Sequence, residues 1–308
     1  MNHLSFYWLP YNKENILKGL ESEFCKLVEK SIRSNNIALP PIPDVVLEIQ
    51  QLCSNESTTI KDIADLLLQD PSLAASVIRV ANSAVFNRRN ITCLDLITAV
   101  SRLGICRVRD IVTAQAIEQL KHSANLNKEC NEQLKKSSAA SREFAAVMVM
   151  VCQSIQKHSA PNENQHLELD KALLVGLLAD IGLFCLVNEY YNYGDKGNYL
   201  DIEIAKYIFS KRCSATSRLV LHRWHFDNDF LEVASNRSLQ SKPDNMVSYL
   251  DIARMASHLL MFRNQDEAIE EHEVEVTAVG AEALYELSNL TKTQFTHNIK
   301  EIISFSGL

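Results

Sequence analysis

Glycine and proline are scarce in this 308-residue sequence, with eight and seven residues respectively. Three of the prolines stand together in the segment LPPIP, residues 39–43. Few positions therefore remain for the tight turns that join the strands of a β-rich protein. The length is sufficient for two domains. We expect an all-α protein built from two packed helical subdomains.

The sequence also lacks paired cysteines, because its eight cysteines are scattered singly and no CxxC occurs. This pattern is typical of reduced thiols in the cytosol rather than of a disulfide framework. The amino terminus has no basic segment followed by an apolar stretch and a cleavage site, so it does not resemble a signal peptide. We expect a cytoplasmic protein.

Long hydrophobic runs and an excess of basic residues are absent too. The longest apolar runs, Phe144–Cys152 and Ala172–Val187, are shorter than the roughly 20 residues that cross a bilayer. The formal net charge of −7 opposes general binding to nucleic acid, which depends on a basic surface. Neither a membrane nor nucleic acid is therefore an expected partner.

Apolar spacing and capping residues predict helices along most of the chain. Thr59 with Asp62, Asp70 with Pro71, and Thr92 with Asp95 resemble helix starts. The predicted helices cover residues 14–32, 45–52, 59–67, 70–81, 92–104, 105–120, 135–156, 201–209, 215–225, 230–235 and 246–262, with a loop at 190–199. The predicted parts are an amino-terminal extension (1–35), two subdomains (36–122 and 123–262) and an acidic carboxy-terminal helical segment (263–308).

One carboxylate, Asp180, stands in the middle of the apolar run VGLLADIGLFCLV, residues 175–187. An ionised carboxylate in the core requires a metal, a cation or several hydrogen-bond donors, because its uncompensated burial costs many kcal/mol. The sequence therefore predicts a partner for Asp180, and the nature of that partner bears on function.

Three segments resemble the HDOD family, bacterial signalling domains related to HD-type metal phosphohydrolases. They are LPPIP, LLLQDPSLAASVIRVANSAVF (66–86) and ITAVSRLGICRVRDIV (97–112). The proline-rich start, acid-Pro-x-Leu, Ala-Asn-Ser and the later Leu-Gly follow the family's order and spacing. The resemblance covers residues 36–262 and implies that the second subdomain is a degenerate HD-type helical core.

The resemblance also implies that the metal ligands of an HD enzyme are lost. Asp180 stands at the aspartate of the His-Asp pair, and its histidine is replaced by Ala179. The degenerate HD-site positions are Lys136, Ala179, Asp180, Cys213, Asn236, Arg237 and Arg254. Since the expected histidines are all missing, we expect no catalytic residue, no bound metal and no cofactor.

Two explanations for Asp180 remain open at this point. In the first, Lys136 and Arg254 replace the charge of the metal and pair with Asp180. In the second, Asp180 only accepts hydrogen bonds from neighbouring helix ends.

The leading functional hypothesis is a non-catalytic signalling or scaffold protein that binds a protein partner. An anionic small molecule could also bind near Lys136, Arg237 and Arg254, and Arg88 and Arg89 are further candidate contacts for an anion or a partner. The oligomeric state is left open.

Two alternatives belong to other classes. A divergent phosphohydrolase or phosphodiesterase would bind metal through Asp180, His222 and His225, the two histidines lying near Asp227 and Asp229. A DNA-binding regulator would instead use Arg102, Arg107 and Arg109 on a helix-turn-helix-like segment.

Overall fold

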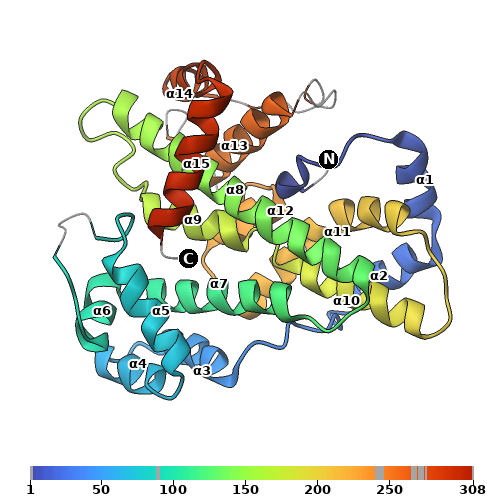
Figure 1. Ribbon diagram of the computed structural model, residues 1–308, viewed down its shortest axis with the longest axis horizontal. Coiled ribbons are helices and arrows are strands. Elements are labelled where there is room, and N and C mark those ends of the chain that lie inside the picture. The colour runs from blue at the N-terminus through green and yellow to red at the C-terminus, as the bar shows by residue number, and fades with distance from the viewer. Residues whose placement is uncertain are drawn as a thin grey trace.

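The computed structural model describes residues 3–87, 91–239, 246–264, 269, 274 and 276–306, and these contain helices and no strand. The predicted all-α class is therefore confirmed (Figure 1). Buried residues from both predicted subdomains and from the amino-terminal segment belong to one continuous hydrophobic core.

Residues 44–123 form a group of five helices. They are α3 (Asp44–Cys53), α4 (Ile60–Leu67), α5 (Pro71–Asn82), α6 (Leu96–Leu103) and α7 (Ile105–Ser123). Thr59 and Asp62 form the predicted reciprocal cap of α4, and Asp70 caps α5 just before its proline. Asp95 rather than Thr92 caps α6, and Gly104, at φ +81°, separates α6 from α7.

The long helix α8 (Lys128–His158) runs through the centre of the molecule (Figure 1). Its buried residues contact helices on several sides, so the second half of the chain is built around it. These helices are α9 (Leu169–Leu178), α10 (Gly182–Asp195), α11 (Ile202–Arg223), α12 (Asn228–Ser235), α13 (Tyr249–Arg263), α14 (Ala278–Ser288) and α15 (Lys292–Ser306).

The amino-terminal extension packs on α10 and α11 and consists of a short 3-10 helix η1 (Leu4–Phe6) followed by α1 (Lys13–Glu21) and α2 (Glu23–Arg33). The prediction of one helix over 14–32 was wrong. Ser22 adopts an extended conformation and its hydroxyl caps α2, which ends one helix and begins the next.

Two further element predictions were wrong. Helix α10 continues to Asp195 where a loop was expected, because Tyr190 and Tyr193 pack against the ring of Phe24. Residues 202–223 form one helix where two were expected. Its middle stays helical because Ser210 and Cys213 are buried against neighbouring elements.

The stretch Leu169–Asp195 is long and apolar enough to cross a membrane by length and composition. However, 89% of its most apolar window is buried inside the fold. The stretch contains α9 and α10, which are separated by the turn that contains Asp180. We therefore assign it to the core.

Candidate functional site

Asp180 lies in the short turn between α9 and α10, and only 1% of its surface is exposed. Gly182 begins α10 in close contact with α11, where its backbone N–H donates to Ser217 Oγ at 3.0 Å. A Cβ at Gly182 would lie 2.3 Å from the backbone nitrogen of Ser217. The glycine thus allows the Asp180 turn to lie directly on α11.

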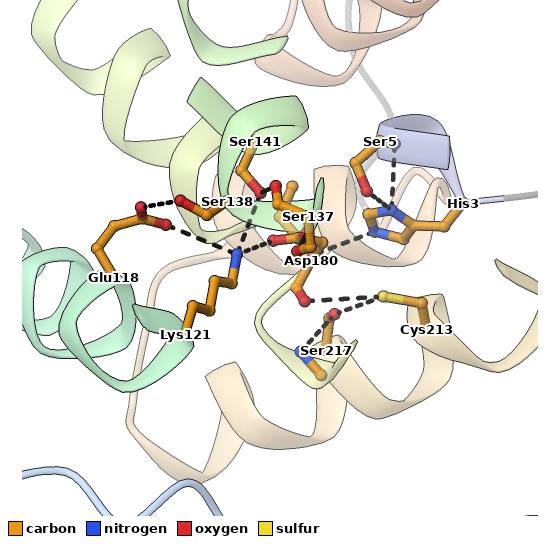
Figure 2. Close-up of polar contacts among 12 residues, drawn as sticks. His3, Ser5, Glu118, Lys121, Ser137, Ser138, Ser141, Asp180, Cys213 and Ser217 are labelled. Atoms are coloured by element: carbon orange, nitrogen blue, oxygen red, sulfur yellow. Dashed lines mark hydrogen bonds and ion pairs between the residues drawn. The ribbon is translucent and has the colours of Figure 1, made fainter. Parts of the chain in front are cut away.

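Lys121, on the last turns of α7, is the cation that pairs with Asp180. Its Nζ lies 3.1 Å from Asp180 Oδ1, and both side chains are almost completely buried, at 0% and 2% exposure. Glu118, one turn earlier on α7, lies 3.7 Å from the same ammonium. Figure 2 shows the ammonium of Lys121 between the two carboxylates.

Serines of α8 complete the surroundings of this ion pair. Ser137 Oγ donates to Asp180 Oδ2 at 2.6 Å, while Lys121 Nζ donates to Ser141 Oγ at 3.2 Å. Ser138 donates to Glu118 at 2.6 Å. Both carboxylate oxygens of Asp180 are therefore occupied by protein donors.

The electrostatics agree with an ionised pair. Burial alone would raise the pKa of Asp180, but the Lys121 ammonium and the Ser137 hydroxyl hold it below its usual value. Burial would likewise lower the pKa of Lys121, but Asp180 and Glu118 raise it instead. The pair is therefore charged at neutral pH.

His3, from the amino-terminal segment, covers the Asp180 turn on another side (Figure 2). Its Nε2 lies 2.9 Å from the carbonyl oxygen of Ala179, which only accepts, so Nε2 carries the proton. Its Nδ1 then accepts from the backbone N–H and hydroxyl of Ser5. This arrangement requires a neutral ring, and burial lowers the pKa of His3 to about 4.

Cys213 of α11 lies under the same turn, with its Sγ 3.8 Å from the carbonyl oxygen of Asp180. The thiol is completely buried, and burial raises its pKa far above the usual value. A thiol held in this state is a poor nucleophile and a poor metal ligand.

The predicted pairing of Asp180 with Lys136 and Arg254 was wrong. Lys136 is exposed, because its neighbour Ser137 takes the inward face of α8 and successive helical residues point about 100° apart. Arg254 instead donates from Nε to Asn236 Oδ1 at 2.8 Å. A cation does pair with Asp180, but it comes from α7.

Of the degenerate HD-site positions, Ala179, Asp180 and Cys213 lie together around this turn, and Arg254 contacts Asn236 elsewhere. Arg237 follows Asn236 and is exposed. Arg88 and Arg89 lie outside the described residues.

Lys121 and His3 were missed by sequence reasoning. Lys121 continues the spacing of Ala114 and Ile117 on the buried face of α7, so a lysine in an apolar stripe was the available signal. No comparable signal pointed to His3, which lies 176 residues before Ala179, its hydrogen-bond acceptor.

The histidines of the metal alternative do not gather with acids. In the part of the chain that the structure describes, no group of three or more His, Cys, Asp or Glu side chains is arranged to hold a metal ion. Helix α11 ends at Arg223, so His225 is not one turn along a helix from His222. Asp227 and Asp229 both pair with Lys171.

The three arginines of the DNA-binding alternative are engaged within the molecule. Arg102 donates to the carbonyl of Ala81, and Arg107 pairs with Glu168 and Asp170. Arg109 pairs with Asp110 at 2.7 Å and is itself buried. Each of the three guanidinium groups therefore has a partner within the molecule.

Asn82 has a structural role. Its side chain donates to the carbonyl of Cys93 at 2.7 Å and accepts from the backbone N–H of Cys93 at 2.8 Å. It therefore connects the end of α5 to the segment that leads into α6, within the motif Ala-Asn-Ser.

The family model of the HDOD domain matches residues 39–238, well over half of the chain. The chain belongs to the HDOD family. This family is related to HD-type phosphohydrolases, as the Ala179–Asp180 turn suggested.

Two solved structures from Shewanella amazonensis SB2B share the fold of this HDOD protein. One, named as a "putative metal-dependent phosphohydrolase", is 23% identical, with 94% of this chain and 99% of that chain covered and a TM-score of 0.67. The other, named as a "putative phosphohydrolase", is 17% identical, with 92% and 99% covered and a TM-score of 0.50. At these identities the likeness shows the fold alone.

A curated protein of Treponema pallidum (strain Nichols), named as an uncharacterized protein, is 34% identical over 74 residues. The match covers 24% of this chain and 14% of that protein. This chain thus aligns with only a small part of its curated relative.

The residues around Asp180 do not fit the divalent metal of an HD enzyme. Such a site requires several imidazole and carboxylate ligands. Here one carboxylate oxygen contacts an ammonium group, which has no lone pair to offer a metal, and the other contacts a hydroxyl. His3, an imidazole that contacts the same turn, uses both ring nitrogens in protein hydrogen bonds.

Proposed function

We propose that this HDOD protein is a non-catalytic signalling or scaffold protein that acts by binding another protein. The observation that carries the proposal is the buried ion pair between Lys121 and Asp180. It gives the one carboxylate of the HD pair a protein cation in place of a metal, so no metal-bound water is generated there.

The exposed surface favours a binding role. Among the described residues, the aliphatic side chains that are more than half exposed are Leu27, Leu68, Ile91, Leu94 and Ile97. All except Leu27 belong to the region of α4 to α6. Exposed apolar side chains that gather in one region are typical of surfaces that contact a partner.

The non-catalytic part of the proposal is tested by hydrolysis assays. Purified protein is incubated with 4-nitrophenyl phosphate and bis(4-nitrophenyl) phosphate in the presence of Mn²⁺, Fe²⁺ or Zn²⁺. We expect the same rate as in buffer with metal alone, for both the wild type and Asp180→Asn. Metal-dependent hydrolysis that disappears in Asp180→Asn would favour the divergent phosphohydrolase instead.

The binding part is tested with a partner that co-purifies with the chain and is then prepared separately. The affinity of the two purified proteins is measured with and without EDTA. We expect EDTA to have no effect, and Leu68→Asp combined with Leu94→Asp to weaken binding at least tenfold. Tyr199→Asp, an equally exposed position outside this region, is the control. Equal effects of both changes would contradict the proposed surface.

A further inference from the structure

A cavity of about 450 Å³ lies between α11 and the carboxyl end of α12. Four basic side chains line it, namely Lys211, Arg212, Arg218 and Arg237, together with Ser214 and Asn236. Among the described residues, no acidic side chain lines the cavity. In a chain of net charge −7, this is a local concentration of positive charge.

The charges of the cavity are mostly unneutralised. Arg212 pairs with Glu29 of α2. Within the described ranges, no carboxylate lies within ion-pair distance of Lys211, Arg218 or Arg237. Three cations around one concave site repel each other, and an anion that contacts all three would relieve this repulsion.

Helix α11 and the α12 cap position these cations. Lys211, Ala215 and Arg218 follow a spacing of four and three, so they share one face of α11. Cys213 and Ser217 face the Asp180 turn instead. The cavity is thus formed on a different face of the helix that supports the buried ion pair.

The turn that carries Arg237 is held in place by Arg254. Asn236 adopts a left-handed conformation at φ 49°, which ends α12. Arg254 donates to both the side-chain and the backbone oxygen of Asn236. Arg254 therefore fixes the backbone next to Arg237.

The lining indicates the chemistry of a ligand. Guanidinium groups recognise phosphate oxygens through paired hydrogen bonds, and Lys211 adds a point charge. The volume is within the usual range of small-molecule sites. In the described part of the chain, no aromatic side chain lines the cavity. These features favour the recognition of phosphate groups.

We propose that this cavity is a binding site for a small phosphate-bearing molecule, held through its phosphate groups by Lys211, Arg218 and Arg237. The inference does not depend on the signalling function proposed above. The proposed site differs from the anion site expected near Lys136, Arg237 and Arg254. The exposed Lys136 does not line the cavity, and Arg254 only positions the backbone next to Arg237.

The test is a calorimetric titration of the full chain with pyrophosphate in 50 mM and 200 mM salt. We expect saturable binding of one pyrophosphate per chain, weakened by salt. Arg218→Gln and Arg237→Gln should each weaken it three- to tenfold, and the two together at least thirtyfold. Both side chains are exposed and pair with no carboxylate of the described residues, so folding should be preserved, as checked by circular dichroism.

Lys61→Gln, which removes an exposed positive charge on α4, is the matched control and should change the affinity less than twofold. The proposal is overturned if pyrophosphate does not saturate, or if Lys61→Gln weakens binding as much as the cavity variants. It is also overturned if a phosphopeptide or single-stranded RNA binds through these arginines while pyrophosphate does not.

Discussion

Asp180 and Lys121 show how a single carboxylate is kept charged inside an apolar core. The ammonium and the Ser137 hydroxyl contact one carboxylate oxygen each. Removal of one partner of such a pair leaves a buried charge without compensation, which costs more than the pair itself contributes.

Lys121→Met should therefore lower the free energy of unfolding by roughly 3–5 kcal/mol. Combining it with Asp180→Asn should lower it by less than the sum of the two single changes, with a coupling above about 1 kcal/mol. The free energies of unfolding of the wild type, the two single variants and the double variant are measured by urea denaturation. Lys136→Met, at the exposed neighbour of Ser137, is the control and should stay within about 0.5 kcal/mol of the wild type. Additive effects of Lys121→Met and Asp180→Asn would contradict the pair.

His3 should make stability depend on pH. The ring is neutral in the fold, where its pKa is about 4, and it protonates near 6.5 when unfolded. The unfolded state therefore binds more protons between these values. Stability is fully present above about pH 6.5 and is lost as the pH falls towards 4.

Between pH 7 and pH 5 this effect should lower the free energy of unfolding by about 2 kcal/mol, since one pKa unit corresponds to about 1.4 kcal/mol. His3→Gln should lack this contribution, so the difference in stability between the wild type and the variant should narrow as the pH falls. A difference that stays constant from pH 7 to pH 5 would show that His3 is not held neutral.

The sequence allowed one part of this site to be predicted. An acid within VGLLADIGLFCLV requires a partner, and a cation in place of the metal was one of the two explanations. The identity of that cation was not predictable, because Lys121 lies 59 residues from Asp180 and is brought near it only by the packing of α7. The spacing of apolar residues predicts which face of a helix is buried, but not which other helix packs against that face.

At the scale of elements, close helix contacts depend on two glycines. A Cβ at Gly176 would lie 2.6 Å from the Cα of Ala145 on α8, and one at Gly182 would collide with the backbone of α11. These contacts hold α9 and α10 in place on either side of the Asp180 turn.

Gly182→Ala should destabilise the protein by at least about 3 kcal/mol, or prevent folding, because backbone atoms of α11 cannot move aside cheaply. Gly194→Ala, on the same helix with no atom within 4 Å of the added methyl, should instead stabilise it by roughly 0.5–1 kcal/mol. Thermal unfolding compares the stability of each variant with that of the wild type. Equal effects would mean that α10 does not lie against α11 as described.

Element boundaries were predictable where a side chain caps a helix. Thr59 and Asp70 gave the starts of α4 and α5, whereas the start of α6 was placed at Thr92 and its cap is Asp95. Other errors arose where tertiary contacts decide, as in α10, which Phe24 extends, and in α11, where Ser210 and Cys213 are buried. Local propensity contains no information on either contact.

At the scale of the whole molecule, the motifs in the first half were sufficient to indicate the family, and the family model confirms it over residues 39–238. The amino-terminal segment contributes to the same core, with Leu4, Phe6 and Leu9 buried. Its packing could not be predicted, since its contacts on α8, α11 and α13 are far away in the chain.

The most direct test of the central claim is the metal content of the protein. The chain is purified without a histidine tag or chelator, exposed separately to manganese, iron and zinc, desalted and analysed by inductively coupled plasma mass spectrometry. Since Lys121 compensates the charge of Asp180, we expect far less than one metal ion per chain, and the same content in a folded Asp180→Asn variant. Near-stoichiometric metal that is lost in Asp180→Asn would contradict the account.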